Sequence, residues 1–196
     1  MIPALILILS AVVYRIAAAL LIHSGQALWL SNFAPVAAIA LCGAVYFPAK
    51  FKFTIPLGTL FISDLVLNYV YGAPLVTAQM LSRYFALALV GVIGFALQNR
   101  ASFKTLLPAS LVGSTIFYLI TNLASWLTDP GYAKNFAGLI QALTVGLPQY
   151  STTPTWMFFR NTLLSDLFFT LLFVACMKFG RNTSGARAEA ALPRVA

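Results

Sequence analysis

Five charged side chains lie inside segments that are otherwise apolar enough to cross a membrane. They are Arg15, Asp64, Arg83, Arg160 and Asp166. An ionised group in hydrocarbon costs about 2.5–3.5 kcal/mol on insertion scales, so five cost about 12–18 kcal/mol before any compensation. That cost is as large as the whole net stability of a typical domain, about 5–15 kcal/mol. We therefore expect the five groups to compensate one another in a shared interior, which is also the place to look for function.

The last apolar segment shows how the charges are arranged around a helix. Thr162, Asp166 and Thr170 recur every four residues, so they share one helix face. Arg160 lies six residues from Asp166 and points to a different side, which argues against a direct pair. We expect Asp166 to meet Arg15 or polar groups on a neighbouring helix, and Arg160 to face a cavity.

The charges have two alternative roles. Arg15, Asp64 and Asp166 are predicted to form a buried charge network, because buried carboxylate–arginine pairs hold helices in register at little net gain in stability. Arg83 and Arg160 are shallower and lie near aromatic residues. For these two arginines both alternatives stay open, namely contact with a ligand or the same structural pairing.

The composition is that of an integral membrane protein. Of 196 residues, 61% are hydrophobic and 8% are charged, and the mean hydropathy is +0.90, whereas a soluble domain is about 45–50% apolar and about 25% charged. At about 20 residues per span, six helices with short loops fill the chain. We expect an all-α transmembrane domain over 1–179 and a disordered, basic cytoplasmic tail over 180–196. The predicted spans are 3–22, 33–49, 55–71, 76–98, 105–127 and 156–178.

Lysine and arginine residues alternate between successive predicted loops. Eight lie in the loops and tail on one side of the membrane, and one, Lys134, lies on the other. Because cytoplasmic loops are enriched in these residues, the pattern predicts that both termini are cytoplasmic. The formal charge of +8 does not indicate a nucleic-acid partner, since the basic residues are not clustered on one soluble face. The lipid bilayer is the partner that the composition predicts.

The long loop before the last predicted span, 128–155, has a helical pattern of its own. Apolar residues recur in it at helical spacing until glycine and proline interrupt the pattern. The segment is too short to span, so we expect a short outer helix that either covers hydrophobic surface or acts as a lid. The recurring residues are Phe136, Leu139, Ile140, Leu143 and Leu147.

Aromatic residues gather toward the predicted outer side. All three tryptophans, Trp29, Trp126 and Trp156, lie near it. They serve either as interface anchors or as walls of a pocket that opens outward. Such a pocket should be mostly apolar, with a few polar groups that orient the ligand. The candidate ligand-binding residues are Arg83, Tyr84, Asn122, Trp126, Trp156, Arg160 and Asn161.

The sequence offers little for catalysis or for a cofactor. It has one histidine and two cysteines, without the clustering typical of a metal site, and no Gly-x-x-x-x-Gly-Lys motif for ATP. A dyad of Asp64 and Asp166 is the remaining catalytic arrangement, and it requires their two helix faces to meet. We therefore expect a protein that is not an enzyme and that needs no metal or cofactor.

Four segments carry a resemblance to known proteins: 32–47, 62–65, 120–126 and 158–169. They resemble an uncharacterised family of bacterial six-helix membrane proteins. The resemblance implies a location in the bacterial cytoplasmic membrane, and it brings no function with it.

The length, the six predicted helices with both ends inside, the short second span and the long outer loop are together similar to the S-components of energy-coupling factor transporters. Those proteins bind vitamins or related micronutrients in a pocket open to the outside, and most are then served by an ATPase module with its own transmembrane subunit. The resemblance implies a small-molecule ligand and such a module as partners. We predict a membrane-embedded binding or uptake protein for a small polar or anionic micronutrient. The alternative is a structural or assembly subunit in which the buried charges are interhelical glue.

Overall fold

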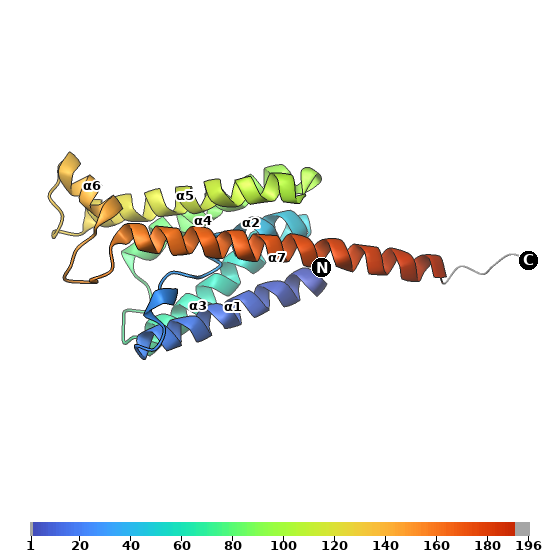
Figure 1. Cartoon of the computed structure of the whole chain (residues 1–196), viewed down its shortest axis with the longest axis horizontal. Coiled ribbons are helices and arrows are strands. Elements are labelled where there is room, and N and C mark those ends of the chain that lie inside the picture. Colours follow the sequence, from blue (N-terminus) through green and yellow to red (C-terminus); the bar gives the residue numbers. More distant parts are fainter. Residues whose placement is uncertain (1, 191–196) are drawn as a thin grey trace, which may run out of the picture.

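The computed structural model describes residues 2–190, and the regular elements in that range are all helices. Figure 1 shows them as a bundle from which the C-terminal helix projects. The prediction of an all-α fold is confirmed for this part of the chain. The α-helices are α1 (Ile2–His23), α2 (Val36–Tyr46), α3 (Thr54–Val70), α4 (Ala78–Leu97), α5 (Phe103–Thr128), α6 (Phe136–Thr144) and α7 (Thr155–Ala190).

Five helices are long and apolar enough to cross a membrane. They are α1, α3 together with the 3₁₀ turn that precedes it, α4, α5 and α7. Their outward side chains are largely apolar, which suits a lipid environment; examples are Ile6, Val13, Phe85, Val92 and Leu171. These features are typical of a helical membrane protein. The two remaining helices, α2 and α6, are shorter.

The predicted second span, 33–49, is helical only over Val36–Tyr46, so the helix is shorter than the predicted span. Its 11 residues extend for about 16 Å, roughly half of the hydrocarbon thickness of a bilayer. Prolines set both limits. Pro35 stands at the N-cap, where its missing N–H costs nothing. Pro48 disfavours helical backbone in the preceding Phe47, which is extended with a ψ of 152°.

Helix α2 lies at the centre of the bundle, in contact with α1, α3, α4, α5 and α7. Every residue from Val36 to Val45 is buried. The alanine and glycine content of this helix permits such burial, because small residues let neighbouring backbones approach closely. One close approach is to α4, where a side chain at Gly94 would meet the carbonyl oxygen of Leu41 and the methyl group of Ala44.

The two ends of the bundle carry different elements (Figure 1). One end, called the α6 end here, holds α6 and the segments 24–35, 71–77 and 129–154. The other, called the basic end, holds the 3₁₀ turns Ala49–Phe51 and Gln98–Arg100. The start of α1 and the C-terminal half of α7 also lie toward the basic end, so the first and the last helix have their free ends on the same side.

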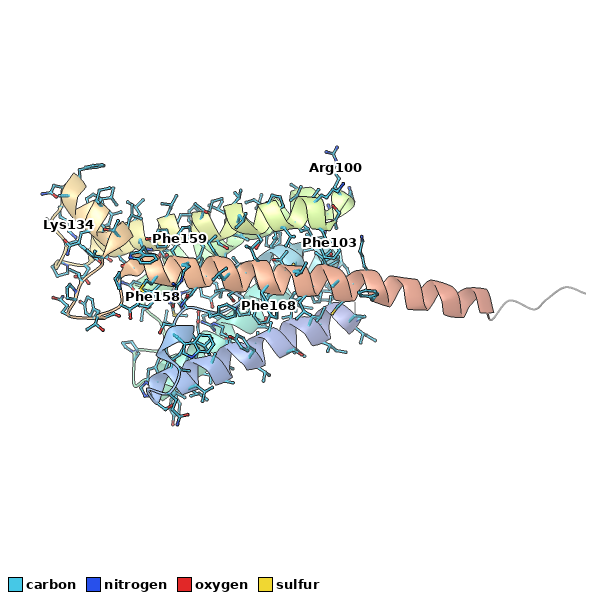
Figure 2. All side chains as sticks on the ribbon, in the orientation of Figure 1. Arg100, Phe103, Lys134, Phe158, Phe159 and Phe168 are labelled. Atoms are coloured by element: carbon cyan, nitrogen blue, oxygen red, sulfur yellow. The ribbon has the colours of Figure 1, made fainter. Side chains whose placement is uncertain are left out.

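Basic residues are concentrated at the basic end. Figure 2 places Arg100 there and Lys134 at the α6 end. The elements at the basic end also carry Lys50, Lys52, Lys104 and Lys178. The folded chain therefore keeps the charge asymmetry that the loop sequences predict.

The short helix predicted between the last two spans is present as α6. Asn135 caps it, since its Oδ1 accepts a hydrogen bond of 2.9 Å from the N–H of Gly138. After it, Gly146 has a φ of 74°, a left-handed conformation that glycine adopts without steric cost. The helix is attached to α5, because the Tyr118 hydroxyl donates a hydrogen bond to the carbonyl of Leu143.

Helix α7 is longer than predicted. It continues to Ala190. The last predicted span ends at 178, and disorder was predicted from 180. The second half of 181–190 is rich in alanine, with arginine and glutamate, which are good helix formers, whereas the run Asn-Thr-Ser-Gly before it is not. Residues 191–196 of the predicted tail lie outside the described residues.

We expect Gly94→Ala to lower the free energy of unfolding by about 1–3 kcal/mol, the usual cost of overpacking. The added methyl group would collide with the backbone of α2, which is buried and cannot move aside. The matched control is Gly58→Ala in α3, where a methyl group meets no atom within 4 Å. An SDS titration of both variants in mixed micelles measures the difference. Equal stabilities would contradict the tight packing of α2 on α4.

Candidate functional site

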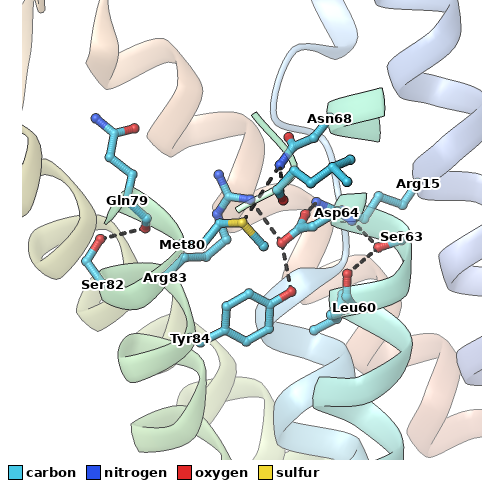
Figure 3. Close-up of polar contacts among 11 residues, drawn as sticks. Arg15, Leu60, Ser63, Asp64, Asn68, Gln79, Met80, Ser82, Arg83 and Tyr84 are labelled. Atoms are coloured by element: carbon cyan, nitrogen blue, oxygen red, sulfur yellow. Dashed lines mark hydrogen bonds and ion pairs between the residues drawn. The ribbon is translucent and has the colours of Figure 1, made fainter. Parts of the chain in front are cut away.

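One carboxylate joins three helices at the α6 end of the bundle (Figure 3). Asp64 of α3 forms an ion pair with Arg15 of α1 through its Oδ1. Its Oδ2 lies 3.1 Å from Nη1 of Arg83 in α4 and accepts a hydrogen bond of 2.7 Å from the Tyr84 hydroxyl. We call these four residues the Asp64 cluster. Arg15 and Asp64 were predicted as network members, and they meet directly.

The face of α1 that packs into the bundle explains how Arg15 is accommodated. The buried residues of α1 recur at three- and four-residue intervals, and Ala11 and Ala18 flank Arg15 on that face. These small side chains leave room for the guanidinium group. Arg15 also donates to Oγ of Ser63, and the Ser63 hydroxyl in turn donates to the carbonyl of Leu60 at 2.7 Å. The buried guanidinium is therefore both paired and hydrogen-bonded.

The Asp64 cluster carries an uncompensated positive charge, because two guanidinium groups share one carboxylate. The exposed fractions of the side chains show where the excess lies: 10% for Arg15, 4% for Asp64 and 34% for Arg83. Arg83 is thus the accessible member. Its guanidinium makes a single contact with the carboxylate, which leaves most of its five N–H donors directed elsewhere.

Both arginines line a cavity of about 280 Å³ between α1, α4, α5 and α7. Among the described residues that line it, these arginines are the only charged ones. The polar lining consists of Asn32, Gln79, Ser82, Thr121, Asn122, Ser125, Thr155 and Thr162. The aromatic lining consists of Phe117, Tyr118, Phe158 and Phe159.

The aromatic wall of this cavity is built from α5 and the first turns of α7. The rings of Tyr118 and Phe159 stack with their centroids 4.3 Å apart. Figure 2 shows Phe158 and Phe159 at the start of α7, close to α6. Because the Tyr118 hydroxyl is bonded to the carbonyl of Leu143, the cavity wall is mechanically linked to α6.

Irregular backbone enters the bundle beside the cavity. Asp166 meets the first turn of α2 and lies eleven residues into α7, so α2 starts about 16 Å along α7. The preceding segment 31–35 therefore lies inside the bundle, with Asn32 at a φ of 60°. Non-helical backbone at membrane depth is tolerated where it is buried in protein or lines a cavity, and Asn32 and Ala34 do line one. This placement singles out the segment as part of a site.

A second cavity of about 400 Å³ adjoins the first. It lies between α1, α3 and the segments before α2 and α7. The two cavities share four lining residues, namely Arg15, Asn32, Ala34 and Phe158. Arg15 consequently lines both cavities, and the shared residues lie where the two cavities adjoin.

The second buried carboxylate, Asp166, has a different counterpart. Its Oδ1 accepts a hydrogen bond of 2.9 Å from the N–H of Ala38, and its Oδ2 accepts one of 2.8 Å from the Ser114 hydroxyl. The partial positive charge at the N-terminus of α2 therefore compensates it. The polar contact continues from Thr170 to Ser110 at 3.2 Å. Of the two predicted partners for Asp166, polar groups on neighbouring helices are found.

The predicted single network of Arg15, Asp64 and Asp166 is thus two separate clusters. Arg15 is engaged by Asp64 and Ser63, and Asp166 is fully buried against α2 and α5. The pairing of Asp166 with Arg15 is corrected on this ground. The carboxylates of Asp64 and Asp166 also fail to form a dyad, because each has its own partners.

Of the seven predicted pocket residues, two line a cavity and five do not. Arg83 and Asn122 line the first cavity. Tyr84 instead donates to Asp64, and Trp126 donates to the carbonyl of Ala133 at 2.9 Å, beside α6. These two aromatic residues support the cavity region without lining it.

Arg160, Asn161 and Trp156 lie outside both cavities. Arg160 is exposed, lies over the Trp156 ring at 5.9 Å and donates to Oδ1 of Asn161 at 3.1 Å. Asn161 donates to the carbonyls of Trp29 and Ser31 at 3.0 and 2.9 Å, so it fastens the segment before α2 to α7. The expectation that Arg160 faces a cavity is corrected, because its depth in α7 says nothing about its direction around the helix.

Several lining residues escaped the sequence analysis although a signal was available. Gln79 lies one turn before Arg83, and Phe117 and Thr121 lie one turn apart, next to Ser125 on the same face of α5. Four-residue spacing from a charged or polar anchor would have found them. Asn32 carries no such signal, since its place depends on the early start of α2.

The fold and the site define a class: a helical protein with segments long and apolar enough to span a membrane and with a polar, cationic cavity between its helices. The chain belongs to the Family of unknown function (DUF6580), which it matches over residues 1–188. Comparisons with curated proteins and with solved structures found no match in either group. The Asp64 cluster, Asp166 and both cavities therefore lie within the family's matched region.

We expect Asp64→Asn to lower the free energy of unfolding by about 3–5 kcal/mol, because it leaves the buried Arg15 without its counter-charge. Arg83→Gln should cost less than about 1 kcal/mol, since the pair of Arg15 and Asp64 remains and Arg83 is one-third exposed. SDS titration of the two variants measures both values. If Asp64→Asn proved as stable as Arg83→Gln, Asp64 would not be the centre of the cluster.

Asp166→Asn should destabilise the protein by about 1–3 kcal/mol, because the amide cannot accept hydrogen bonds at both positions and leaves a buried donor unpaired. Thermal unfolding in detergent provides the measurement. Asp129→Asn is the control, since its Oδ1 accepts from the N–H of Gly131 at 2.8 Å in a loop and an asparagine Oδ1 keeps that bond. If Asp166→Asn were as stable as Asp129→Asn, the capping role of Asp166 would be refuted.

Proposed function

We propose that this protein is a membrane-embedded binding or uptake protein for a small polar or anionic micronutrient, held in the cavity of about 280 Å³. The observation that carries the proposal is the shared carboxylate. Arg15 and Arg83 both line the cavity, and Asp64 is the only described residue that forms an ion pair with them. Because an unmatched charge in the interior is costly, a ligand that supplies negative charge or strong acceptors would stabilise the arrangement.

The lining supports a ligand of modest size. Ligand pockets commonly measure about 300–1,000 Å³, so a cavity of about 280 Å³ suits a small molecule. Four aromatic side chains offer apolar contact, and the hydroxyl and amide groups of α5 and α7 offer orientation. This combination of a largely fixed wall and a few polar anchors is typical of small-molecule sites.

The charge asymmetry supports an orientation for the bundle. The positive-inside rule places the basic end in the cytoplasm, and the α6 end with its cavity then faces outward. In this proposal α2 and the segment 31–35 together make the second of six crossings, and the location is the bacterial cytoplasmic membrane. Helices that start within the bundle lie beside binding sites in several transporter folds, and α2 starts about 16 Å along α7 with Val36 on the cavity lining.

The similarity to S-components stays a prediction, because it depends on span number, orientation and the outer loop alone. Under it, an ATPase module with its own transmembrane subunit would drive uptake, since the chain has no Gly-x-x-x-x-Gly-Lys motif of its own. No catalytic role is proposed.

One observation favours the alternative of a structural or assembly subunit. The Asp64 cluster joins α1, α3 and α4, as expected of ion pairs that hold helices together. That role accounts for Arg15 and Asp64 equally well. It does not account for the second arginine, which is one-third exposed and lines a cavity.

We expect Arg83→Gln to release a small molecule that co-purifies with the wild-type protein. A charge-assisted hydrogen bond contributes about 1.5–3 kcal/mol, so affinity should fall about 10- to 100-fold. Native mass spectrometry from detergent measures the occupancy. Arg160→Gln is the matched control, because it removes the same group at the same end of the bundle but outside both cavities, and it should retain the ligand.

The remaining outcomes separate the two proposed functions. Loss of the ligand in Arg160→Gln but not in Arg83→Gln would move the site away from the cavity. A wild-type protein that carries no small molecule under any purification condition would favour the assembly subunit.

A further inference from the structure

We infer that the cavity selects molecules with one negative charge, of the carboxylate or sulfonate class, attached to a flat apolar body. The inference rests on the proposed function and adds a rule for the charge of the ligand. The charges that line the cavity, the donors that remain available there and its aromatic lining together support this rule.

The charge of the site follows from its three ionised members. Arg15 and Arg83 contribute two positive charges and Asp64 one negative charge, which leaves one positive charge on the cavity lining. Arg160 and Lys134 do not line either cavity among the described residues. One monoanion therefore brings the site to neutrality, whereas a dianion leaves one negative charge and a neutral molecule leaves one positive charge without a partner on the lining.

The fourth interior charge does not alter this balance. Asp166 is fully buried and lines neither cavity. Both of its oxygens accept hydrogen bonds, from the N–H of Ala38 and from the Ser114 hydroxyl. Its charge is compensated locally by the N-terminus of α2.

For the same reason, the N-terminus of α2 offers no separate position for an anion. The N–H of Ala38 is taken by Asp166. The N–H groups of Val36 and Ile39 donate to the carbonyls of Ala34 and Pro35, both at 2.9 Å. A second negative charge on the ligand would thus find no cationic counterpart, and the two arginines are the charged anchors of the site.

Arg83 has the donors to hold a carboxylate. Its guanidinium contacts Asp64 through Nη1 at 3.1 Å, and the side chain, which is one-third exposed, lines the cavity. A guanidinium presents five N–H donors in a planar fork that matches a carboxylate in bidentate fashion. Arg83 can therefore bind the ligand and keep its contact with Asp64.

The aromatic part of the cavity lining suits a flat apolar body. Phe117 and Phe158 line the cavity together with the stacked pair of Tyr118 and Phe159. Aromatic side chains bury large areas and favour offset or edge contacts with another ring. A small molecule that carries an acidic group at one end and a ring at the other would satisfy the arginines and the aromatic lining.

The test uses four probes that share one ring and differ in charge: benzoate and benzenesulfonate with one negative charge, benzamide with none, and phenyl phosphate with two at pH 8. Their dissociation constants for the full-length protein in detergent are measured by ligand-observed NMR. We expect both monoanions to bind at least about tenfold more tightly than benzamide and phenyl phosphate, since like or unmatched charges cost affinity. Tightest binding of the phosphate, or equal binding of benzamide and benzoate, would overturn the inference.

Two variants shift the charge of the cavity without touching the arginines. Gln79 lines the cavity one turn from Arg83 on α4, so Gln79→Lys raises the net charge by one and Gln79→Glu lowers it by one. The preference should move toward phenyl phosphate in the first variant and toward benzamide in the second. Lys134→Gln, which changes a charge at the α6 end outside both cavities, should keep the wild-type order.

Different outcomes would overturn the charge rule and the proposed function. If the probes bind but rank in the same order in both Gln79 variants and in the wild type, charge does not set the preference and this inference is wrong. If no probe binds and the wild-type protein carries no small molecule, the proposed function itself is wrong.

Discussion

The arrangement of this protein depends on where α2 begins. A helix of 11 residues covers about half of a bilayer, and α2 is buried among five neighbours. Its first turn therefore lies inside the bundle, where unpaired N–H groups would be costly. Asp166 removes that cost by accepting from the N–H of Ala38. The early start of α2 also brings the irregular segment 31–35 into the interior, and the space beside that segment is the cavity.

The interior charges are divided by function as well as by position. Asp166 is closed off, with each oxygen hydrogen-bonded and the helix dipole as its counter-charge. Asp64 is central to an open cluster with one guanidinium more than it can neutralise. A closed, neutral cluster stabilises a junction between helices, whereas an open cluster with residual charge is suited to a ligand. This difference in residual charge agrees with their positions, since the Asp64 cluster adjoins a cavity and Asp166 lines neither one.

The rest of the α6 end holds this region in place. Asn161 fastens the segment before α2 to α7 through the carbonyls of Trp29 and Ser31, and Tyr118 links the aromatic wall to α6 through Leu143. Neither residue carries charge, so both position the site without altering its electrostatics. Since the family match covers residues 1–188, these supports belong to the same matched region as the site.

From the sequence alone one can predict the helices, the ends of most of them, the asymmetry of the loop charges and the identity of the costly residues, because hydrophobic length and charge depend on order along the chain. Only the tertiary structure decided which partners those residues have. Asp166 accepts from a backbone N–H of α2, a partner that residue types alone do not predict. Arg160 is exposed and lies outside both cavities, although residues at the same depth line one. The depth of a residue follows from its position along its helix. The neighbour that its side chain faces depends on how the helices pack.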